Sequence, residues 1–164
     1  MRRLALAVPV LAALGLAAPT GARADSQGKP ISLGLFTPVQ IVPEGQGIEG
    51  FRFSLIYGSN AFLTGLDIGL VNVTAGQVRG VQWGFVGIVG GHFTGWQWNG
   101  VNVVQRSFEG LQMGFYNQAQ HVKGLQFGLV NNTVTMEGVQ IGLVNIIQKG
   151  GMLPVFPIFN FSFK

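Results

Sequence analysis

The sequence contains no cysteine, and this absence excludes several kinds of protein at once. Disulfide bonds cannot stabilise the fold, although an exported compartment would permit them. A lipoprotein held through a lipid-modified N-terminal cysteine is excluded as well. Thiolate ligands are missing and the acidic residues are scattered, so we expect neither a metal site nor another cofactor.

Charged side chains are also scarce, at 10% of the residues. The closest acidic pair in sequence, Glu44 and Glu49, lies beside Pro43 in a segment typical of a solvated loop. His92 and His121 fall in variable stretches, and no GxxxxGK phosphate-binding loop occurs. A catalytic site needs polar groups that converge in a pocket. The sequence therefore predicts no catalytic residues and a protein that is not an enzyme.

Residues 1–24 have the features of a secretory signal peptide. Arg2 and Arg3 give it a positive start, residues 4–18 are mostly apolar, and residues 22–24 (Ala-Arg-Ala) offer a small-residue cleavage site. The apolar stretch is short for a membrane anchor, and glycine or polar residues interrupt every later apolar run. We therefore expect cleavage after Ala24 and export to the periplasm, the outer membrane or the cell surface.

Loss of this leader would lower the formal net charge from +4 to +1, because three arginines leave with it. A nearly neutral chain lacks the basic footprint of a nucleic-acid-binding protein. The sequence identifies no specific partner beyond an association with the outer membrane or the cell surface.

Seven regularly spaced glycines organise the rest of the chain. They recur at intervals of about 14–15 residues, a short and constant period that indicates one small structural unit repeated in tandem. The longer interval separates the first five glycines, and the shorter interval separates the last three. The marker glycines are Gly50, Gly65, Gly80, Gly95, Gly110, Gly124 and Gly138.

Within each copy, counted from its glycine as position 1, apolar and polar residues alternate. The copy at Gly124 has Leu125, Phe127 and Leu129 at positions 2, 4 and 6, and Gln126 at position 3. A period of two residues is typical of a β-strand with one buried face. We expect positions 2, 4 and 6 to fill the core, and the glutamines from Gln82 to Gln140 to form a column on the outside.

Two further positions recur. Position 8 is usually asparagine, as at Asn117 and Asn131, which suits a corner at the end of a strand. An apolar residue returns two residues before each new glycine, and we expect it in the core. These apolar residues are Leu63, Val78, Phe93, Phe108, Val122 and Met136.

Three all-β arrangements fit this pattern: a β-solenoid or β-roll, an antiparallel meander, and a meander closed into a small outer-membrane barrel. The solenoid is favoured because Glu109, Lys123 and Glu137 would stack with alternating sign. The apolar part of each strand is also short for an outer-membrane belt. The aromatic alternation in residues 159–163 (Phe-Asn-Phe-Ser-Phe) instead favours the barrel.

The expected organisation is a signal peptide (1–24), an N-terminal lead or cap (25–48), tandem β repeats (49–151) and a C-terminal capping strand (152–164).

One stretch departs from the pattern. Asn99 and Gly100 replace the usual residues at positions 5 and 6, and Gly87 replaces the corner asparagine. Departures from a repeat can mark function. An aromatic platform here could bind a sugar or a protein, although these positions would otherwise belong to the core. The candidate binding residues are Trp83, Trp96 and Trp98.

The phrase Gly-Leu-Gln-x-Gly-Leu-x-Asn, clearest in residues 110–117 and 124–131, resembles a family of bacterial surface repeat-containing proteins of the leptospiral type. The tail at residues 153–163 resembles that family's closing segment. The resemblance implies a surface protein but no established biochemical role. We expect an exported, non-enzymatic structural or surface protein of the bacterial cell envelope. The alternatives are a small outer-membrane barrel protein and a glycan- or protein-binding solenoid.

Overall fold

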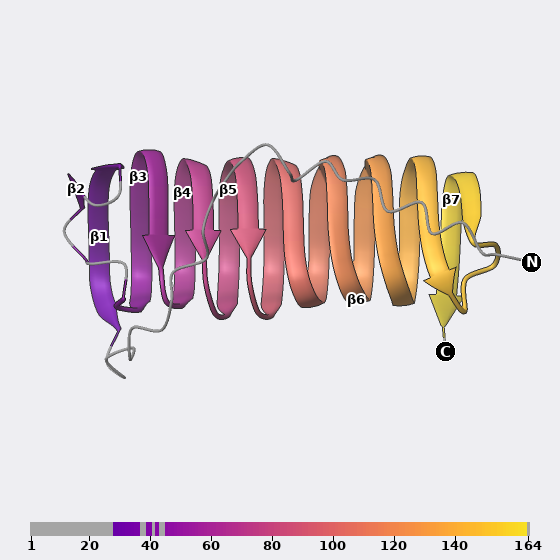
Figure 1. Ribbon diagram of the computed structural model, residues 1–164, viewed down its shortest axis with the longest axis horizontal. Coiled ribbons are helices and arrows are strands. Elements are labelled where there is room, and N and C mark those ends of the chain that lie inside the picture. Colours follow the sequence, from indigo (N-terminus) through magenta and orange to yellow (C-terminus); the bar gives the residue numbers. More distant parts are fainter. Residues whose placement is uncertain (1–27, 37–38, 41, 43–44, 164) are drawn as a thin grey trace, which may run out of the picture.

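The computed structural model describes residues 28–36, 39–40, 42 and 45–163, and over these residues the protein is a β-solenoid (Figure 1). The expected signal peptide lies outside the described residues, as do Pro43 and Glu44. No described segment is a helix that could cross a membrane.

The strands follow one another along the long axis of the molecule (Figure 1). They form one sheet in the order β2-β1-β3-β4-β5-β6-β7. The strand β6 is 57 residues long and continues through about four turns of the solenoid. The strands are β1 (Lys29–Phe36), β2 (Val39–Gln40), β3 (Ile48–Asn60), β4 (Leu63–Thr74), β5 (Val78–Val89), β6 (Phe93–Lys149) and β7 (Val155–Phe163).

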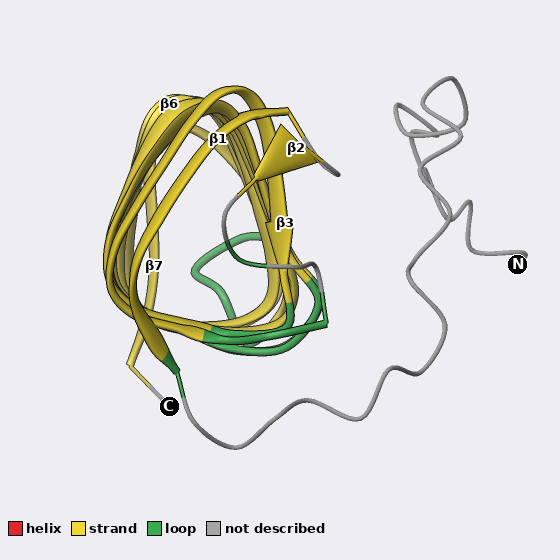
Figure 2. Cartoon of the chain, turned by 90° about the vertical axis from the view of Figure 1, so that its left-hand side faces the viewer, coloured by secondary structure: helices red, strands yellow, loops and turns green. Residues whose placement is uncertain are grey.

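Successive copies are parallel and stack one period apart. Gly50 pairs with Gly65, and Gly80 pairs with Gly95. Every turn therefore runs in the same direction, as the end view in Figure 2 shows. The solenoid prediction is confirmed, and the antiparallel meander and the barrel made from it are wrong.

The two ends of the stack differ from its middle. At one end β1 pairs parallel with β3 and antiparallel with the short β2. At the other end β7 pairs antiparallel with the last turn of β6, for example Phe161 with Val139. The aromatic alternation that favoured a barrel therefore belongs to a single terminal strand.

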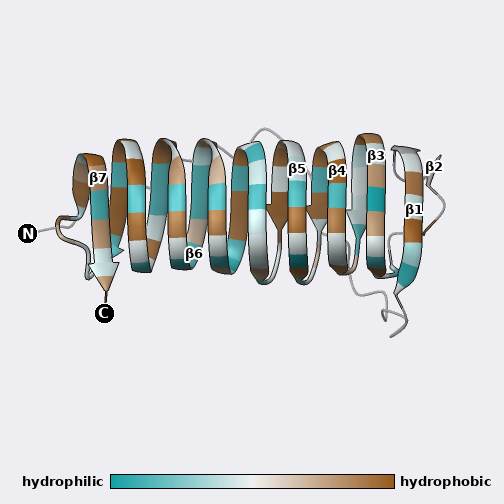
Figure 3. Ribbon diagram, turned by 180° about the vertical axis from the view of Figure 1, so that it is seen from behind, coloured by the Kyte–Doolittle hydropathy of each residue, from teal (hydrophilic) through white to brown (hydrophobic). Residues whose placement is uncertain are grey.

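The two faces of the repeat are arranged opposite to the prediction. Gln126 is fully buried, whereas Phe127 and Leu129 on the same strand are 49% and 48% exposed. Position 3 is buried in every copy from Arg52 to Gln140. Figure 3 shows the alternation as teal and brown bands along the stack. The prediction that positions 2, 4 and 6 fill the centre, with glutamines outside, is wrong.

The physical reason lies in the glycines. Alternation separates two faces of a strand but does not say which face turns inward. Positions 1 and 5 share the face of position 3 and are mostly glycine. A Cβ atom on Gly128 would collide with the carbonyl oxygen of Gly114 and approach Asn117 Nδ2. Only the glycine and glutamine face can therefore occupy the crowded interior.

The apolar core occupies a different part of the cross-section. As predicted, the residues two before each marker glycine are buried, and the rings of Phe93 and Phe108 stack with centroids 5.4 Å apart. A second buried column includes Val89, Val104 and Ile147. The interior therefore has an apolar half formed by these two columns and an amide half formed by positions 3 and 8.

The marker glycines are required by backbone geometry. All seven have positive φ angles, between 126° at Gly65 and 146° at Gly138. Side-chain-bearing residues rarely adopt this conformation. A Cβ atom on Gly124 would in addition collide with the carbonyl oxygen of Gly110 in the preceding turn. The glycine column thus lets adjacent turns approach closely at this corner.

We expect Gly124→Ala to destabilise the protein by more than about 3 kcal/mol, because it combines backbone strain with a collision between turns. Gly150→Ala is the matched control: its φ is 78°, and the nearest atom to an added Cβ is Ser162 Oγ at 3.7 Å. The control should lose only about 1 kcal/mol. Denaturant unfolding measures both, and equal losses would contradict the role of stacking.

Candidate functional site

A ladder of glutamine side chains runs through the amide half of the interior. From Gln97 to Gln140, each Nε2 donates a hydrogen bond to the Oε1 of the glutamine in the preceding copy, over distances of 2.6 to 2.9 Å. All five glutamines are fully buried. Buried amides are tolerated only when they are hydrogen-bonded, and here identical neighbours supply the partners. The ladder consists of Gln82, Gln97, Gln112, Gln126 and Gln140.

A second ladder, of asparagines at position 8, runs beside the first. Asn102, Asn117 and Asn131 each donate from Nδ2 to the Oδ1 of the asparagine in the following copy, at 2.8 Å. The same Nδ2 of Asn117 also donates to the backbone carbonyl of Phe127 in the next turn. The asparagine donors point toward the C-terminal end and the glutamine donors toward the N-terminal end. The dipoles of the two ladders therefore oppose each other.

A buried ion pair ends the glutamine ladder. Gln82 Nε2 donates to Asp67 Oδ2 at 2.8 Å. Arg52 binds the same carboxylate through two hydrogen bonds of 2.6 Å, and both side chains are fully buried. Arg52 also donates to Asn60 Oδ1 and to the carbonyl of Val73. Arg52 and Asp67 hold the same position in adjacent turns, so this buried pair has a structural place inside the solenoid.

The departure from the repeat at Gly87 is compensated inside the fold. Asn99, from the next copy, occupies the space next to Gly87 and donates to Gln82 Oε1 and Asn102 Oδ1. One asparagine has thus moved from position 8 to position 5 of the next copy. The Oδ1 atoms of Asn72 and Asn99 are buried without a hydrogen-bond partner. The exchange therefore leaves an imperfect point in the asparagine ladder.

The outer surface at positions 2, 4 and 6 is the most unusual feature of the molecule. Large apolar side chains stand exposed along it from β1 to β7. We call this the apolar surface. It consists of Ile31, Leu33, Phe53, Leu55, Leu66, Leu70, Val81, Trp83, Phe85, Trp96, Trp98, Phe115, Phe127, Leu129, Ile141, Leu143, Phe159 and Phe161.

All three candidate tryptophans lie on the apolar surface and not in the core. Trp83 is 53% exposed, and the rings of Trp96 and Trp98 stack with centroids 5.8 Å apart. Trp83 and Trp98 are paired residues of adjacent turns. The structure thus brings the three residues together and leaves them accessible, whereas the alternative that they fill the core is wrong.

A shallow groove of about 650 Å³ runs along the apolar surface. Trp98, Phe115 and Phe127 line it together with other side chains at positions 4 and 6 of the repeat. The glycines at position 5 lie at its base. Gly100 stands where other copies have a large apolar residue at position 6, so it leaves a gap beside the ring of Phe85. The groove offers almost exclusively apolar contacts and no charged group.

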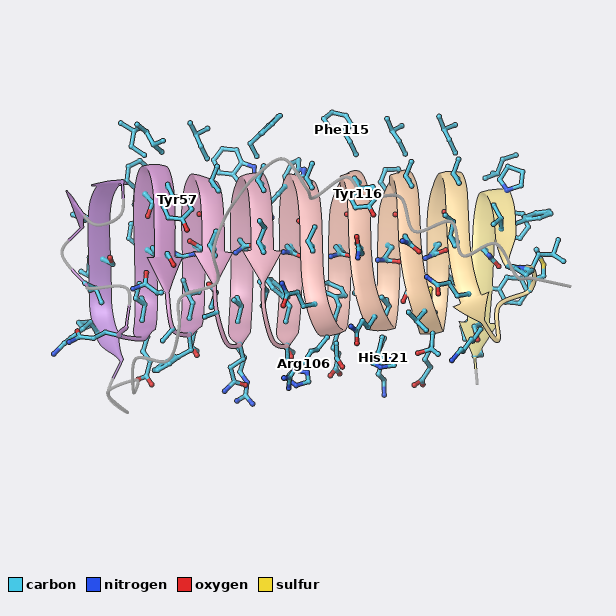
Figure 4. The ribbon with its side chains drawn as sticks, in the orientation of Figure 1. Tyr57, Arg106, Phe115, Tyr116 and His121 are labelled. Atoms are coloured by element: carbon cyan, nitrogen blue, oxygen red, sulfur yellow. The ribbon has the colours of Figure 1, made fainter. Side chains whose placement is uncertain are left out.

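The charged side chains gather at the opposite edge, where each turn closes. Figure 4 shows Arg106 and His121 directed to this edge and Phe115 directed away from it. Lys123 and Glu137 form an exposed ion pair of 3.8 Å here, as the predicted stacking of alternating charges requires. We call this the charged edge. Its exposed residues are Glu49, Arg79, His92, Arg106, Glu109, His121, Lys123, Glu137 and Lys149.

The charged edge is hollowed at one place. A polar hollow of about 300 Å³ includes Arg79, His92 and Glu109. His121 Nδ1 lies 2.6 Å from Thr135 Oγ1 and outside this hollow. Across the part of the chain that the structure describes, no three His, Cys, Asp or Glu side chains come together as metal ligands would.

No protein-family model, curated protein or solved structure matches this chain. The candidate site therefore rests on the geometry alone. Sequence reasoning identified the three tryptophans but missed the apolar surface that contains them. The glycines at positions 1 and 5 could have revealed this surface. They mark the face of the strand that must turn inward, and the apolar residues lie on the opposite face.

The exchange of Gly87 and Asn99 can be tested by reversing it. Gly87→Asn alone should destabilise the protein by about 1 to 3 kcal/mol, because its Cβ would collide with Gln82 and Asn99. Asn99→Gly alone should cost a similar amount, because it removes two buried hydrogen bonds. The double variant should recover wild-type stability in denaturant unfolding. Additive losses would contradict the compensation.

The ion pair allows a second double-variant experiment. Asp67→Gln should cost about 3 to 5 kcal/mol, because Arg52 remains buried without its counter-charge. Adding Arg52→Gln should restore most of the stability by extending the glutamine ladder through two more turns. Thermal or denaturant unfolding measures the recovery. A double variant as unstable as the single one would show that the ladder cannot replace the ion pair.

Proposed function

We propose that this protein is an exported, non-enzymatic structural protein of the bacterial cell envelope, in which a rigid β-solenoid presents an extended apolar surface. The observation that carries the proposal is the separation of its exterior into an apolar surface and a charged edge. A large exposed apolar area of this kind is typical of a surface that works by contact with another apolar phase or molecule.

Three features support a structural role. Amide ladders and apolar columns fill the interior from turn to turn along the described chain, and the two hollows described above both lie at its surface. The groove on the apolar surface offers apolar contacts but no convergent polar groups, which catalysis requires. The leader-like residues 1–24 and the resemblance of the repeat phrase to bacterial surface proteins support a place in the envelope.

A glycan-binding solenoid is the second candidate, and the exposed stack of Trp96 and Trp98 favours it. Aromatic rings suit the apolar faces of sugars, but recognition of a sugar also needs polar groups that bind its hydroxyls. The side chains beside these tryptophans on the apolar surface are themselves apolar. The structural role therefore remains the main proposal.

Export can be tested by expressing the full sequence in a Gram-negative host. We expect the chain to be recovered from the envelope or periplasm with Asp25 as its first residue, as measured by mass spectrometry of the intact protein. Substituting arginine at both Ala22 and Ala24 should block this cleavage, because the cleavage site needs small residues.

The matched control is Ala18→Ser, which should leave cleavage unchanged because it keeps a small residue outside the cleavage site. Recovery of the uncleaved chain from the cytoplasm, with the native leader present, would contradict the proposed export.

A further inference from the structure

We propose that the apolar surface inserts into one leaflet of a lipid bilayer, so that the solenoid lies along the membrane with its charged edge in the headgroup region or in water. The partner is therefore the acyl-chain layer of a lipid surface. This inference deepens the proposed function and rests on it for the presence of a nearby envelope membrane.

The distribution of charge is the first argument. Between positions 1 and 10 of the seven copies, the only charged residues are Arg52 and Asp67, and both are buried and paired. Every other charged side chain of these copies lies where the turns close, at the charged edge. Interfacial proteins show this separation, with one apolar side and one strongly polar side.

The extent of the apolar surface is the second argument. Nine of its exposed side chains are aromatic. If about half of each ring is exposed, these side chains alone contribute roughly 900 Å², from a typical 150–250 Å² per aromatic residue. The largest apolar patch of a typical soluble monomer is only about 300–600 Å². Such a surface needs an apolar environment to cover it.

The shape of the surface favours lipid over a second copy of the chain. Positions 2 and 4 lie on the same side of each strand. Position 6 forms the rim opposite the charged edge, as Phe115 in Figure 4 shows, with exposed fractions up to 67% at Leu143. Beyond the rim the other face continues with Val144, which is also exposed, and with half-buried Val130. A second rigid solenoid could cover one face, whereas fluid acyl chains can surround the rim from both sides.

The interior suits the same environment. In the hydrocarbon region no water satisfies backbone or side-chain polar groups, so these groups must be paired within the protein. The turns of the solenoid pair their backbone groups with adjacent turns. The glutamine and asparagine ladders pair most of the buried amides in the same way. The hydrogen-bonded amides of the interior and the apolar surface therefore match the requirements of immersion in lipid.

The dimensions fit one leaflet. Positions 2 to 6 span four residue steps, which is about 13 Å along a strand. The hydrocarbon core of a bilayer is about 30 Å thick, so this depth is slightly less than one leaflet. Figure 4 places Phe115 at the rim that would lie deepest, and Arg106 and His121 at the edge that would face water.

The chain carries its own probe of this insertion, because all three of its tryptophans lie on the apolar surface. Purified protein is mixed with phosphatidylcholine vesicles, and binding is measured by flotation. Vesicles whose acyl chains are brominated should quench the tryptophan fluorescence by about half or more relative to unbrominated vesicles, since the rings would lie within the acyl region.

A rim variant tests which residues are responsible. Replacing Phe85, Phe115, Leu129 and Leu143 with glutamine keeps all three tryptophans and the interior intact. We expect the partition coefficient for neutral vesicles to fall by at least about a hundredfold, because four apolar side chains lose their burial in lipid. Circular dichroism confirms that the variant remains folded.

The matched control changes the charged edge instead. Arg79→Gln, Arg106→Gln, Lys123→Gln and Lys149→Gln, combined in one chain, should leave binding to neutral vesicles unchanged. If this variant loses binding while the rim variant retains it, the charged edge is the contact and the proposal is wrong.

Analytical ultracentrifugation without lipid tests whether a second copy of the chain covers the apolar surface instead. A stable dimer that the rim variant abolishes, together with no binding of the wild type to vesicles, would show that a second copy covers the surface and would overturn the proposal. Export is measured separately in cells. A correctly exported chain that does not bind vesicles would refute lipid insertion alone. A vesicle-binding chain that is retained in the cytoplasm would refute the envelope role alone.

Discussion

Amide groups buried inside this solenoid find their hydrogen-bond partners in the neighbouring turn, and the rest of the structure depends on this requirement. A glutamine that is shifted by one residue would lose both its donor and its acceptor. The ladders therefore hold the turns in one register, as the pairing of Gln82 with Gln97 shows. The glycine corner allows the close approach that these hydrogen bonds need, since any larger residue there would push adjacent turns apart.

The same interior explains the exterior. A cross-section built from so short a repeat has little room, and the ladders and two apolar columns already fill it. The alternate side chains of each strand must then point outward, whatever their polarity. In this protein they are leucine, phenylalanine and tryptophan, so the apolar surface results from filling the centre with amides. Because apolar residues recur at these positions from copy to copy, the surface is continuous from β1 to β7.

The fold could be predicted from the period of the glycines and the order of the charges. The stacking of Arg52 on Asp67 and of Lys123 on Glu137 was foreseeable, because adjacent copies carry opposite signs at these positions. Hydrophobicity alone could not show which face of the strand turns inward. It places amides outside, whereas here their burial is favourable because identical neighbours satisfy their hydrogen bonds. For the same reason the tryptophans could be singled out, but their exposure on a wide apolar surface could not.

The location of the single-residue difference between long and short copies has a further consequence. Val104 and Ala119 are equivalent residues of adjacent copies and are separated by the longer period. Phe108 and Val122 are also equivalent but are separated by the shorter period. The shorter copy therefore lacks one residue between Ala119 and Val122, at the corner near His121. Contacts in the strands reach only one copy away, so unequal recombination could add or delete a whole copy without creating a new kind of interface. Selection could thus adjust the length of the molecule by copy number, while the corner absorbs small insertions and deletions that a strand would not tolerate.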